Sequence, residues 1–577
     1  MDFTVKPSTT IRLPDGTELA WEGFGTGPLV YDGDFAGHSE RLLGLSPSEV
    51  AEQTSRRLLP YRAGGEGDAP ALILHSATRA TKGFDGDVSD LAAGRTPYDC
   101  ATYLEARAVF LARPGDLTVG RTAPWKESVR VFGIDSVDLG DLEHYYLYQA
   151  LLEAAVRHPE GTGSGATGTT PKATTPAPLT RIIDWVRARP HAIVRTYALD
   201  REMQIFLLWL LRRTGRESLR IDANNHVVSL DWNRKRHIHP FVEDAESLSA
   251  TGMPPDELLA AEQRLGEGYR RVGMAIPVLP GYTMARPDAP AERFVEEAVR
   301  AAALLRRRYG LTHAFLKPSQ SGSGARIVGP IGLQDLALLR EAAADAHQYG
   351  DDYLLEAAVD YVTVPGALTP CPVAPSGHIR NGEIAPGLTL QILDRYSWEG
   401  NAYIDRPEWE RCGLAVGLYD DMRRAMHDIH AAFRSEASAA DGSHGGLVTG
   451  GVDFAVGRLG GVFGDRVLTG AIDFNFSSHG AELLRAFHER ITADRPPAEH
   501  YTATRVYRPT ATATLTDTRT AVLTALPSTA RAEVVACVPN RWGMVAATGT
   551  HMNHAMERTQ ELIDTLTTAA LAQNPKA

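Results

Sequence analysis

The sequence has few cysteines, and they lie far apart. The 577 residues include four: Cys100, Cys371, Cys412 and Cys537. No two of them form a CxxC pair, so the sequence predicts neither a disulfide framework nor a cysteine-rich zinc site.

Long apolar runs are also missing. The longest apolar cluster, residues 205–211, is too short for a membrane span and fits a buried helix. The first residues show no basic start followed by an apolar run, which is the pattern of a secretory signal. We therefore expect a cytoplasmic protein with no membrane partner.

The chain has no excess of positive charge. Its formal net charge is −12, from 59 Lys and Arg against 71 Asp and Glu. This balance disfavours a broadly basic nucleic-acid surface, so no nucleic-acid partner is expected. Hydrophobic residues at 43% and charged residues at 23% are typical of a folded protein, and the length predicts several domains.

Strand-like and helix-like segments alternate along the chain, which predicts a mixed α/β fold. Residues 70–77 and 106–115 are expected to be strands, 141–158 a helix, and 218–235 a strand, turn and strand. Residues 161–178 consist almost wholly of Gly, Thr, Ala, Ser and Pro. That composition indicates a flexible linker or an insertion.

The segment FLKPSQSGSGARI could bind phosphate. A predicted strand carries Lys317, and a loop of small residues follows, with Ser321, Gly322, Ser323 and Gly324. Glycines let backbone N–H groups approach a phosphate, and the lysine supplies positive charge. The segment matches neither GxxxxGK[ST] nor GxGxxG. Taken alone, it fits an ordinary glycine-rich hairpin with a surface lysine equally well.

Two carboxylates and an amide lie in neighbouring predicted strands. Asp453 belongs to GGVDFAV, and Asp473 and Asn475 belong to AIDFNF. Strand alternation places Asp473 and Asn475 on one face, with Asp453 opposite if the strands pair. Three oxygen ligands would then suit Mg²⁺ bridging nucleotide phosphates. Surface carboxylates are the alternative, disfavoured because both acids lie in apolar runs.

A third segment, YLLEAAVDY, is an apolar strand with Glu356 and Asp360 near its end. Such a strand could form a hinge along an adenine and ribose, although a core strand with edge carboxylates is the simpler interpretation. Farther on, GHIRNGEI predicts a hairpin, because Asn381-Gly382 suits a type I′ turn.

The order of these segments resembles the ATP-grasp superfamily of ligases over roughly residues 275–489. The resemblance implies an ATP-grasp domain at 271–495, an N-terminal pre-ATP-grasp α/β domain at 1–270 and a small C-terminal α/β domain at 496–577. Residues 220–241 and 531–564 are more loosely similar to the pheganomycin-type peptide ligases. IPVLPGYTM also resembles the segment that opens the ATP-grasp domain.

The resemblance implies a role for each candidate residue. Lys317 would bind phosphate, Ser321 to Gly324 would close over the phosphates, Glu356 would lie beside the adenine and Asp360 beside the ribose. Asp453, Asp473 and Asn475 would hold Mg²⁺ or Mn²⁺. Arg395 would stabilise the transferred phosphate, although an exposed loop ion pair explains this arginine equally well.

The sequence departs from the family pattern at one position. The family often has an arginine two residues after the Asn, whereas Ser477 stands here, followed by His479. His479 either replaces part of that function or caps the next helix.

The activity implied is that of an ATP-dependent carboxylate–amine ligase. It would form an amide through an acyl-phosphate, releasing ADP and phosphate, in specialised peptide metabolism such as antibiotic biosynthesis. An amino-acid-like carboxylate would be the donor and an amino acid or peptide amine the acceptor, in a homodimer. The alternatives are an ATP-grasp enzyme with a non-amine acceptor and a degenerate nucleotide-binding regulatory protein.

Overall fold

The computed structural model describes residues 10–12, 18–20, 31–61, 69–76, 100–120, 123–139, 147–157, 177–249, 252–284, 289–320, 326–348, 351–394, 397–440, 447–492, 499–526 and 530–573. Most of the predicted linker at 161–178 lies outside these residues, as do Ser321 to Gly324 and Arg395. A short hairpin, β1 (Thr10–Arg12) and β2 (Glu18–Ala20), precedes the first unit.

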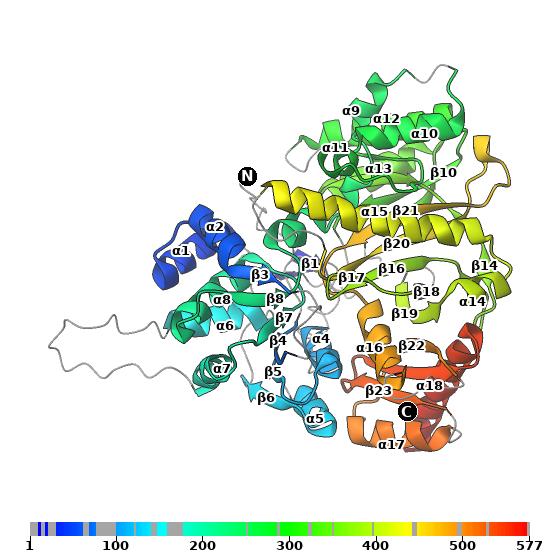
Figure 1. Cartoon of the computed structure of the whole chain (residues 1–577). Coiled ribbons are helices and arrows are strands. Elements are labelled where there is room, and N and C mark those ends of the chain that lie inside the picture. The colour runs from blue at the N-terminus through cyan, green and yellow to red at the C-terminus, as the bar shows by residue number, and fades with distance from the viewer. Residues whose placement is uncertain are drawn as a thin grey trace.

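The first unit is a parallel sheet with strand order β3-β8-β7-β4-β5-β6. Figure 1 shows it at the left. Its strands are β3 (Leu58–Pro60), β4 (Ala71–Leu74), β5 (Leu117–Gly120), β6 (Asp135–Asp138), β7 (Ile193–Thr196) and β8 (Leu219–Asp222). Its helices are α1 (Tyr31–Leu43), α2 (Pro47–Arg57), α4 (Cys100–Ala108), η2 (Val109–Leu111), α5 (Ala123–Phe132), α6 (Leu147–Arg157), α7 (Ala177–Arg187) and α8 (Arg201–Thr214).

Both faces of this sheet are covered, as strand β4 shows. Leu72 and Leu74 pack in the core that includes residues of α6, α7 and α8. Ala71 and Ile73 pack with residues of α4 and α5 in a separate core. Successive strand side chains point to opposite faces, so an entirely apolar strand suits a sheet buried on both sides.

The second unit is a four-stranded antiparallel sheet with order β11-β10-β12-β9. Its strands are β9 (Gly281–Thr283), β10 (His313–Pro318), β11 (Val328–Gly332) and β12 (Tyr353–Ala357). The helices and helical turns of this region are η3 (Val228–Trp232), η4 (Lys235–His237), α9 (Val242–Ser247), α10 (Pro255–Leu265), α11 (Glu267–Val272), α12 (Ala291–Tyr309) and α13 (Leu336–His347). Helix α12 buries Phe294, Ala298 and Leu305 on one face against this sheet, as its apolar spacing requires.

The third sheet has ten strands and contains the predicted metal-binding hairpin. Its main order is β13-β20-β16-β18-β19-β22-β24-β23, with β17 beside β16 and β21 beside β20. Its strands are β13 (Asp360–Tyr361), β16 (Pro375–Arg380), β17 (Glu383–Ile384), β18 (Leu388–Asp394), β19 (Ser397–Ile404), β20 (Gly450–Arg458), β21 (Leu468–Asn475), β22 (Tyr501–Tyr507), β23 (Ala532–Cys537) and β24 (Gly543–Gly549). A small separate pair joins β14 (Thr363–Val364) to β15 (Cys371–Pro372).

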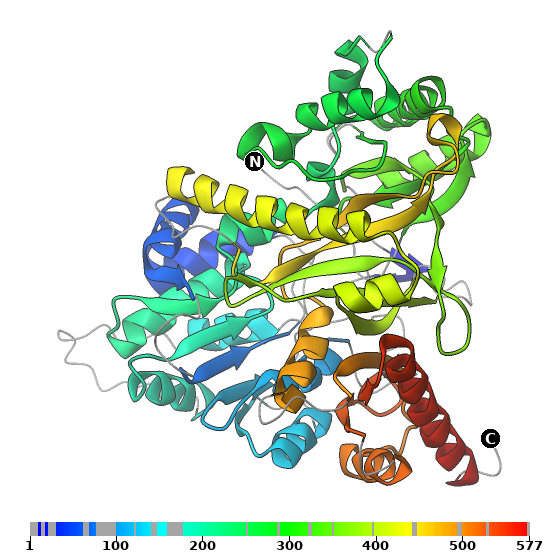
Figure 2. The same cartoon turned by 45° about the vertical axis from the view of Figure 1, so that its right-hand side comes forward.

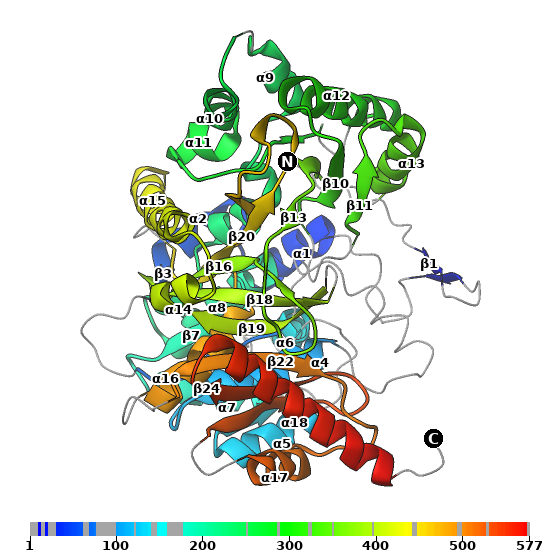
Figure 3. The ribbon, with the colours of Figure 1, turned by 90° about the vertical axis from the view of Figure 1, so that its right-hand side faces the viewer.

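Helices cover the large sheet along its length. They are α14 (Arg406–Arg411), α15 (Val416–Ala440), α16 (Ala481–Thr492), α17 (Leu515–Ala525) and α18 (Met552–Gln573), with the turn η5 (Gly461–Phe463) between β20 and β21. Figure 2 shows α15 as a long yellow helix across the sheet, and Figure 3 shows α18 across β22 and β24. The strands after residue 495 thus join the sheet formed before it. The three-domain division stays a prediction.

The mixed α/β fold predicted from the sequence is confirmed. The strand at 70–77 and the helix at 141–158 appear as β4 and α6, and the hairpin turn has φ 54° at Asn381 and 75° at Gly382. Two predictions are wrong. Residues 106–111 end a helix instead of forming a strand, and residues 228–232 form a π-helical turn. Among the described helices, none has the length and apolar character needed to span a bilayer.

Candidate functional site

The predicted carboxylate pair comes together on the hairpin of β20 and β21. These strands are antiparallel, with Asp453 directly opposite Asp473 and Gly451 opposite Asn475. Residues opposite each other on paired strands project from the same face. Asn475 Nδ2 donates a hydrogen bond to Asp453 Oδ2 at 2.8 Å. The three predicted metal ligands therefore form one group.

Asp453 is held by donors on both sides. Ser376, its partner on β16, donates through Oγ to Asp453 Oδ1, and His479 Nε2 lies 3.2 Å from the same oxygen. The carboxylate is 8% exposed. Burial favours protonation, but the hydrogen bonds from His479 and Ser376 outweigh it, and the pKa of Asp453 lies below its ordinary value. This carboxylate is therefore ionised.

Asp473 has a lysine partner from a distant part of the chain. Lys235 Nζ, on the turn η4, lies 2.7 Å from Asp473 Oδ2. Burial and the facing charge of Asp453 raise the pKa of Asp473, while Lys235 and Lys317 act in the opposite direction. The facing carboxylates thus repel each other, and two lysines from outside the hairpin offset part of that repulsion.

Lys317, the predicted phosphate ligand, is fixed by Glu356. Its ammonium forms an ion pair with Glu356 on the neighbouring strand β12. Glu356 is 1% exposed and also binds His239 Nε2 at 2.9 Å. Burial opposes the ionised form, but Lys317 and His239 outweigh it, and the pKa of Glu356 is lowered. The Glu356 side chain is thus directed at Lys317, and its predicted place beside an adenine stays a prediction.

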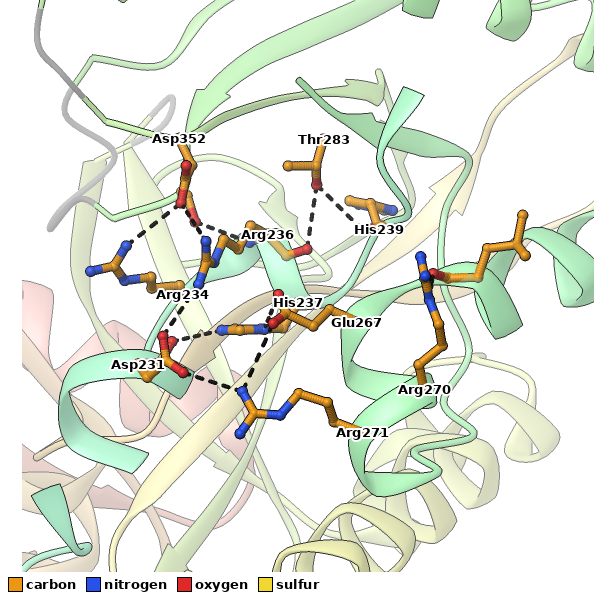
Figure 4. Close-up of polar contacts among 12 residues, drawn as sticks. Asp231, Arg234, Arg236, His237, His239, Glu267, Arg270, Arg271, Thr283 and Asp352 are labelled. Carbon is orange, nitrogen blue, oxygen red and sulfur yellow. Dashed lines mark hydrogen bonds and ion pairs between the residues drawn. The ribbon is translucent and has the colours of Figure 1, made fainter. Parts of the chain in front are cut away.

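The basic segment Arg234 to Arg236 is held by a network of polar contacts, which Figure 4 shows in part. Arg234 and Arg236 lie 3.5 Å and 3.1 Å from Asp352 Oδ2. The backbone N–H of Lys235 donates to Ser319 O at 2.9 Å, and that of Arg236 donates to Ser319 Oγ at 3.0 Å. The segment is therefore attached to the residues that immediately precede the predicted phosphate loop.

Further ion pairs fix this segment from behind. Asp231 lies 3.2 Å from Arg236 and 3.3 Å from Arg271 of helix α11 (Figure 4). His237 Nδ1 lies 3.3 Å from Glu267 Oε2. The contact with His237 and nearby positive charge outweigh the effect of burial and lower the pKa of Glu267 to about 2. Helix α11 therefore holds the turn that carries Lys235.

His479 caps the following helix, one of the two roles expected of it, and also contacts Asp453, while its replacement of the family arginine stays a prediction. Its Nδ1 accepts a hydrogen bond from Ala481 N–H at the start of α16, at 3.2 Å. Nε2 must then carry the proton and donate it to Asp453. The histidine caps the helix and, with the same ring, orients a predicted metal ligand.

The remaining predicted residues are less closely tied to this group. Asp360 is exposed on β13, where it pairs with Arg458 at the far end of β20. Ser321 to Gly324 and Arg395 lie outside the described residues. Their roles stay predictions.

The sequence reasoning missed Lys235 and His239 as parts of the site. The three consecutive basic residues Arg234 to Arg236 were a weak signal, because Arg306 to Arg308 form a similar run. Asp473, the partner of Lys235, and Glu356, the partner of His239, each lie more than 100 residues away, so no local pattern links them.

The donor groups fit a hard divalent cation. Within the described ranges, no group of three or more His, Cys, Asp and Glu residues is gathered as metal ligands. The predicted set instead has two carboxylates and one amide, all oxygen donors of the kind that Mg²⁺ prefers. Asp453 and Asp473 face each other with mutual repulsion, which a bound cation would relieve.

Comparisons with known proteins found no family model and no curated protein that matches the sequence. Solved structures do match. Carboxyaminoimidazole ribonucleotide synthase from Aspergillus clavatus, complexed with ATP, is 12% identical with a TM-score of 0.36, covering 78% of this chain and 98% of that one. D-cycloserine synthetase is 13% identical with a TM-score of 0.31, covering 73% and 100%.

An ATP-grasp superfamily protein from Archaeoglobus fulgidus is 9% identical with a TM-score of 0.30, covering 76% of this chain and 93% of that one. At such identities and TM-scores, these matches assign neither a reaction nor a substrate to this chain.

Proposed function

We propose that this protein is an ATP-dependent ligase that joins a carboxylate to an amine. One observation carries the proposal: Asp453 and Asp473 face each other on paired strands, with Asn475 bound to Asp453. Lys317, from a different sheet, is close enough to influence the ionisation of Asp473. Facing carboxylates with lysines beside them suit a divalent cation and a polyphosphate.

Each residue of the group has a distinct task in this proposal. Asp453, Asp473 and Asn475 would hold Mg²⁺ or Mn²⁺, which when bound neutralises charge on the phosphates. Lys317 provides positive charge for the transferred phosphate, and Glu356 keeps its ammonium in place. Lys235 offsets the negative charge of Asp473.

The reaction proceeds in two transfers. A donor carboxylate oxygen attacks the terminal phosphorus of ATP, and ADP leaves, giving an acyl-phosphate. The amine nitrogen then attacks the acyl carbon, phosphate leaves, and the nitrogen loses a proton to give the amide. The donor in this proposal is amino-acid-like, the acceptor is an amino acid or peptide, and the enzyme is a cytoplasmic homodimer of specialised metabolism.

The experiment is an assay of ADP release with Mg²⁺, a panel of amino acids and guanidino acids as donors, and hydroxylamine to trap the acyl-phosphate. Wild-type protein should give ADP and a hydroxamate. Asp473→Asn should lower both by about 100- to 1,000-fold, the scale of removing a principal electrostatic group. Asp465→Asn is the matched control, because Asp465 is exposed on the same hairpin.

Other outcomes separate the alternatives. Release of AMP in place of ADP would indicate a different activation route, and a phosphorylated or thioester product would indicate a non-amine acceptor. Nucleotide binding without any donor-dependent ADP release would favour a regulatory protein. Full turnover by Asp473→Asn would contradict the assignment of the site.

A further inference from the structure

A second group of charged side chains lies on the same sheet face as the carboxylates. Strand β16 places Ser376, His378 and Arg380 on one side, because alternate strand residues share a face. Ser376 binds Asp453, so His378 and then Arg380 lie successively farther along β16 from the carboxylate pair. We name His378, Arg380 and Arg485 of helix α16 the arginine cluster.

The ring of His378 is buried without a hydrogen bond to any described residue. It is 2% exposed, and neither ring nitrogen has a hydrogen-bond partner among the described residues. Its ring centroid lies 5.8 Å from that of His479, which binds Asp453. Buried polar groups are nearly always hydrogen-bonded, and the exceptions call for a ligand, a water or a function.

The two arginines of the cluster carry more positive charge than their surroundings balance. Arg485 is 6% exposed, and its NH1 donates to Pro386 O at 3.1 Å, a neutral partner. Arg380 is 8% exposed and pairs with Glu489 at 2.8 Å, but the Glu489 side chain is 49% exposed. The Nε atoms of both arginines are buried without a partner among the described residues.

A third arginine, Arg423, adds to the unbalanced positive charge. Arg423 donates to the carbonyl oxygens of Ala385 and Gly387, at 2.7 Å and 3.0 Å, and not to a carboxylate. Burial, with the positive charges of Arg380 and Arg423, holds the pKa of Arg485 below its ordinary value although Glu489 opposes this. Buried guanidinium groups are costly unless an anion balances them.

We propose that the arginine cluster binds the carboxylate of the amine acceptor, so that the acceptor is an amino acid or a peptide with a free C-terminal carboxylate. This inference rests on the proposed ligase function and narrows its amino-acid or peptide acceptor to compounds with a free carboxylate. The donor carboxylate is consumed by phosphorylation, so it belongs beside the lysines and the metal ligands. The cluster is a separate anion site. His479 contacts Asp453 on one side, and its ring lies beside His378 of the cluster.

The geometry also orients the acceptor. His479 links the two groups, because its Nε2 binds Asp453 while its ring lies beside His378. In an α-amino acid the amine is two bonds from the carboxylate. Arg380 lies four residues along β16 from Ser376, roughly 13 Å at strand spacing, so an acceptor held at the cluster must extend along the strand for its amine to reach the carboxylate pair.

The test is a binding measurement that requires no turnover. Full-length protein with ADP and Mg²⁺ is dialysed to equilibrium against pools of L-amino acids and of dipeptides, and against the same compounds as C-terminal amides. Mass spectrometry then measures which compounds are retained. Wild-type protein should retain at least one free acid at least about tenfold more strongly than its amide.

Two variants and a control complete the design. Arg485→Met and Arg380→Met should each weaken retention of that acid at least about tenfold, while ADP is retained as in wild type. Arg485→Lys should keep part of the binding because it keeps the charge. Arg424→Gln is the control, because Arg424 is exposed on α15 and pairs locally with Asp421. A thermal unfolding midpoint shows that each variant is folded.

The inference is overturned if wild-type protein retains acids and amides equally or retains neither. It is equally overturned if Arg485→Met and Arg380→Met retain the acid as wild type does, or if they lose ADP together with it. Failure of the ligase proposal looks different, because it appears as absent donor-dependent ADP release in wild-type protein and does not depend on these variants.

Discussion

The ammonium of Lys235 lies 2.7 Å from Asp473 Oδ2, although 238 residues separate them in the sequence. Lys235 belongs to the predicted N-terminal domain, whereas Asp473 belongs to the predicted ATP-grasp domain. The candidate site is therefore completed by a residue outside the domain that the motifs identify.

Lys235→Met should make the thermal stability of the protein depend more strongly on a divalent cation. The substitution leaves Asp473 facing Asp453 without its ammonium partner, so Mg²⁺ should raise the thermal unfolding midpoint more in the variant than in wild type. Differential scanning calorimetry with and without Mg²⁺ measures this. Lys126→Met is the control, because Lys126 is about half exposed in a pair with Asp138. An equal effect of Mg²⁺ on wild type and Lys235→Met would contradict the prediction.

Glu356→Gln should weaken both the fold and nucleotide binding. It leaves the buried Lys317 ammonium without its carboxylate, and breaking a buried ion pair from one side costs about 3–5 kcal/mol. Urea unfolding measures the free energy of unfolding, and titration with ATP measures affinity, which should fall at least about tenfold. Glu341→Gln on the exposed side of α13 should change neither. Unchanged ATP affinity in Glu356→Gln would show that Glu356 does not position Lys317.

Glu267 should contribute stability that is lost in acid. Its pKa in the folded protein is about 2, below its ordinary value of 4.5, so the ionised form is favoured by folding. The stabilisation is fully present above about pH 4.5 and is lost as the pH falls toward 2. The difference in free energy of unfolding between wild type and Glu267→Gln should therefore shrink across that range. A difference that is constant from pH 6 to pH 3 would contradict the stabilising contact of Glu267 with His237.

The two roles of His479 can be separated by substitution. Asn can still accept a hydrogen bond at the start of α16 but is too short to hold Asp453, whereas Ala does neither. Both variants should therefore lower ADP release, while His479→Ala should also lose about 1 kcal/mol of stability. Steady-state kinetics and urea unfolding of both proteins provide the check. Wild-type turnover by His479→Asn would remove the contact with Asp453 from the mechanism.

The parts of the site that could be predicted are local. Asp473 and Asn475 lie two residues apart on one strand, and a glycine-rich turn connects this strand to that of Asp453. Strand alternation then places the three side chains on a common face. The Asn381-Gly382 turn was predictable for the same reason, because its backbone geometry depends on those two residues.

The parts that could not be predicted depend on tertiary packing. The contact of Lys235 with Asp473 joins segments from different units, and that of His239 with Glu356 joins residues 117 positions apart in the sequence. The prediction of a strand at 106–115 was wrong for another reason. A short apolar run fits a buried strand or a buried helix end equally well, and here Val109 and Phe110 pack as the end of a helix.

The central claim is that Asp453, Asp473 and Asn475 hold one divalent cation beside Lys317. Electron paramagnetic resonance of Mn²⁺, titrated in the presence of ADP, tests this most directly. Wild-type protein and the exposed control Asp465→Asn should bind one Mn²⁺ per chain in this site, and Asp453→Asn and Asp473→Asn should each weaken binding at least about tenfold. Equal Mn²⁺ affinity in all four proteins would contradict the claim.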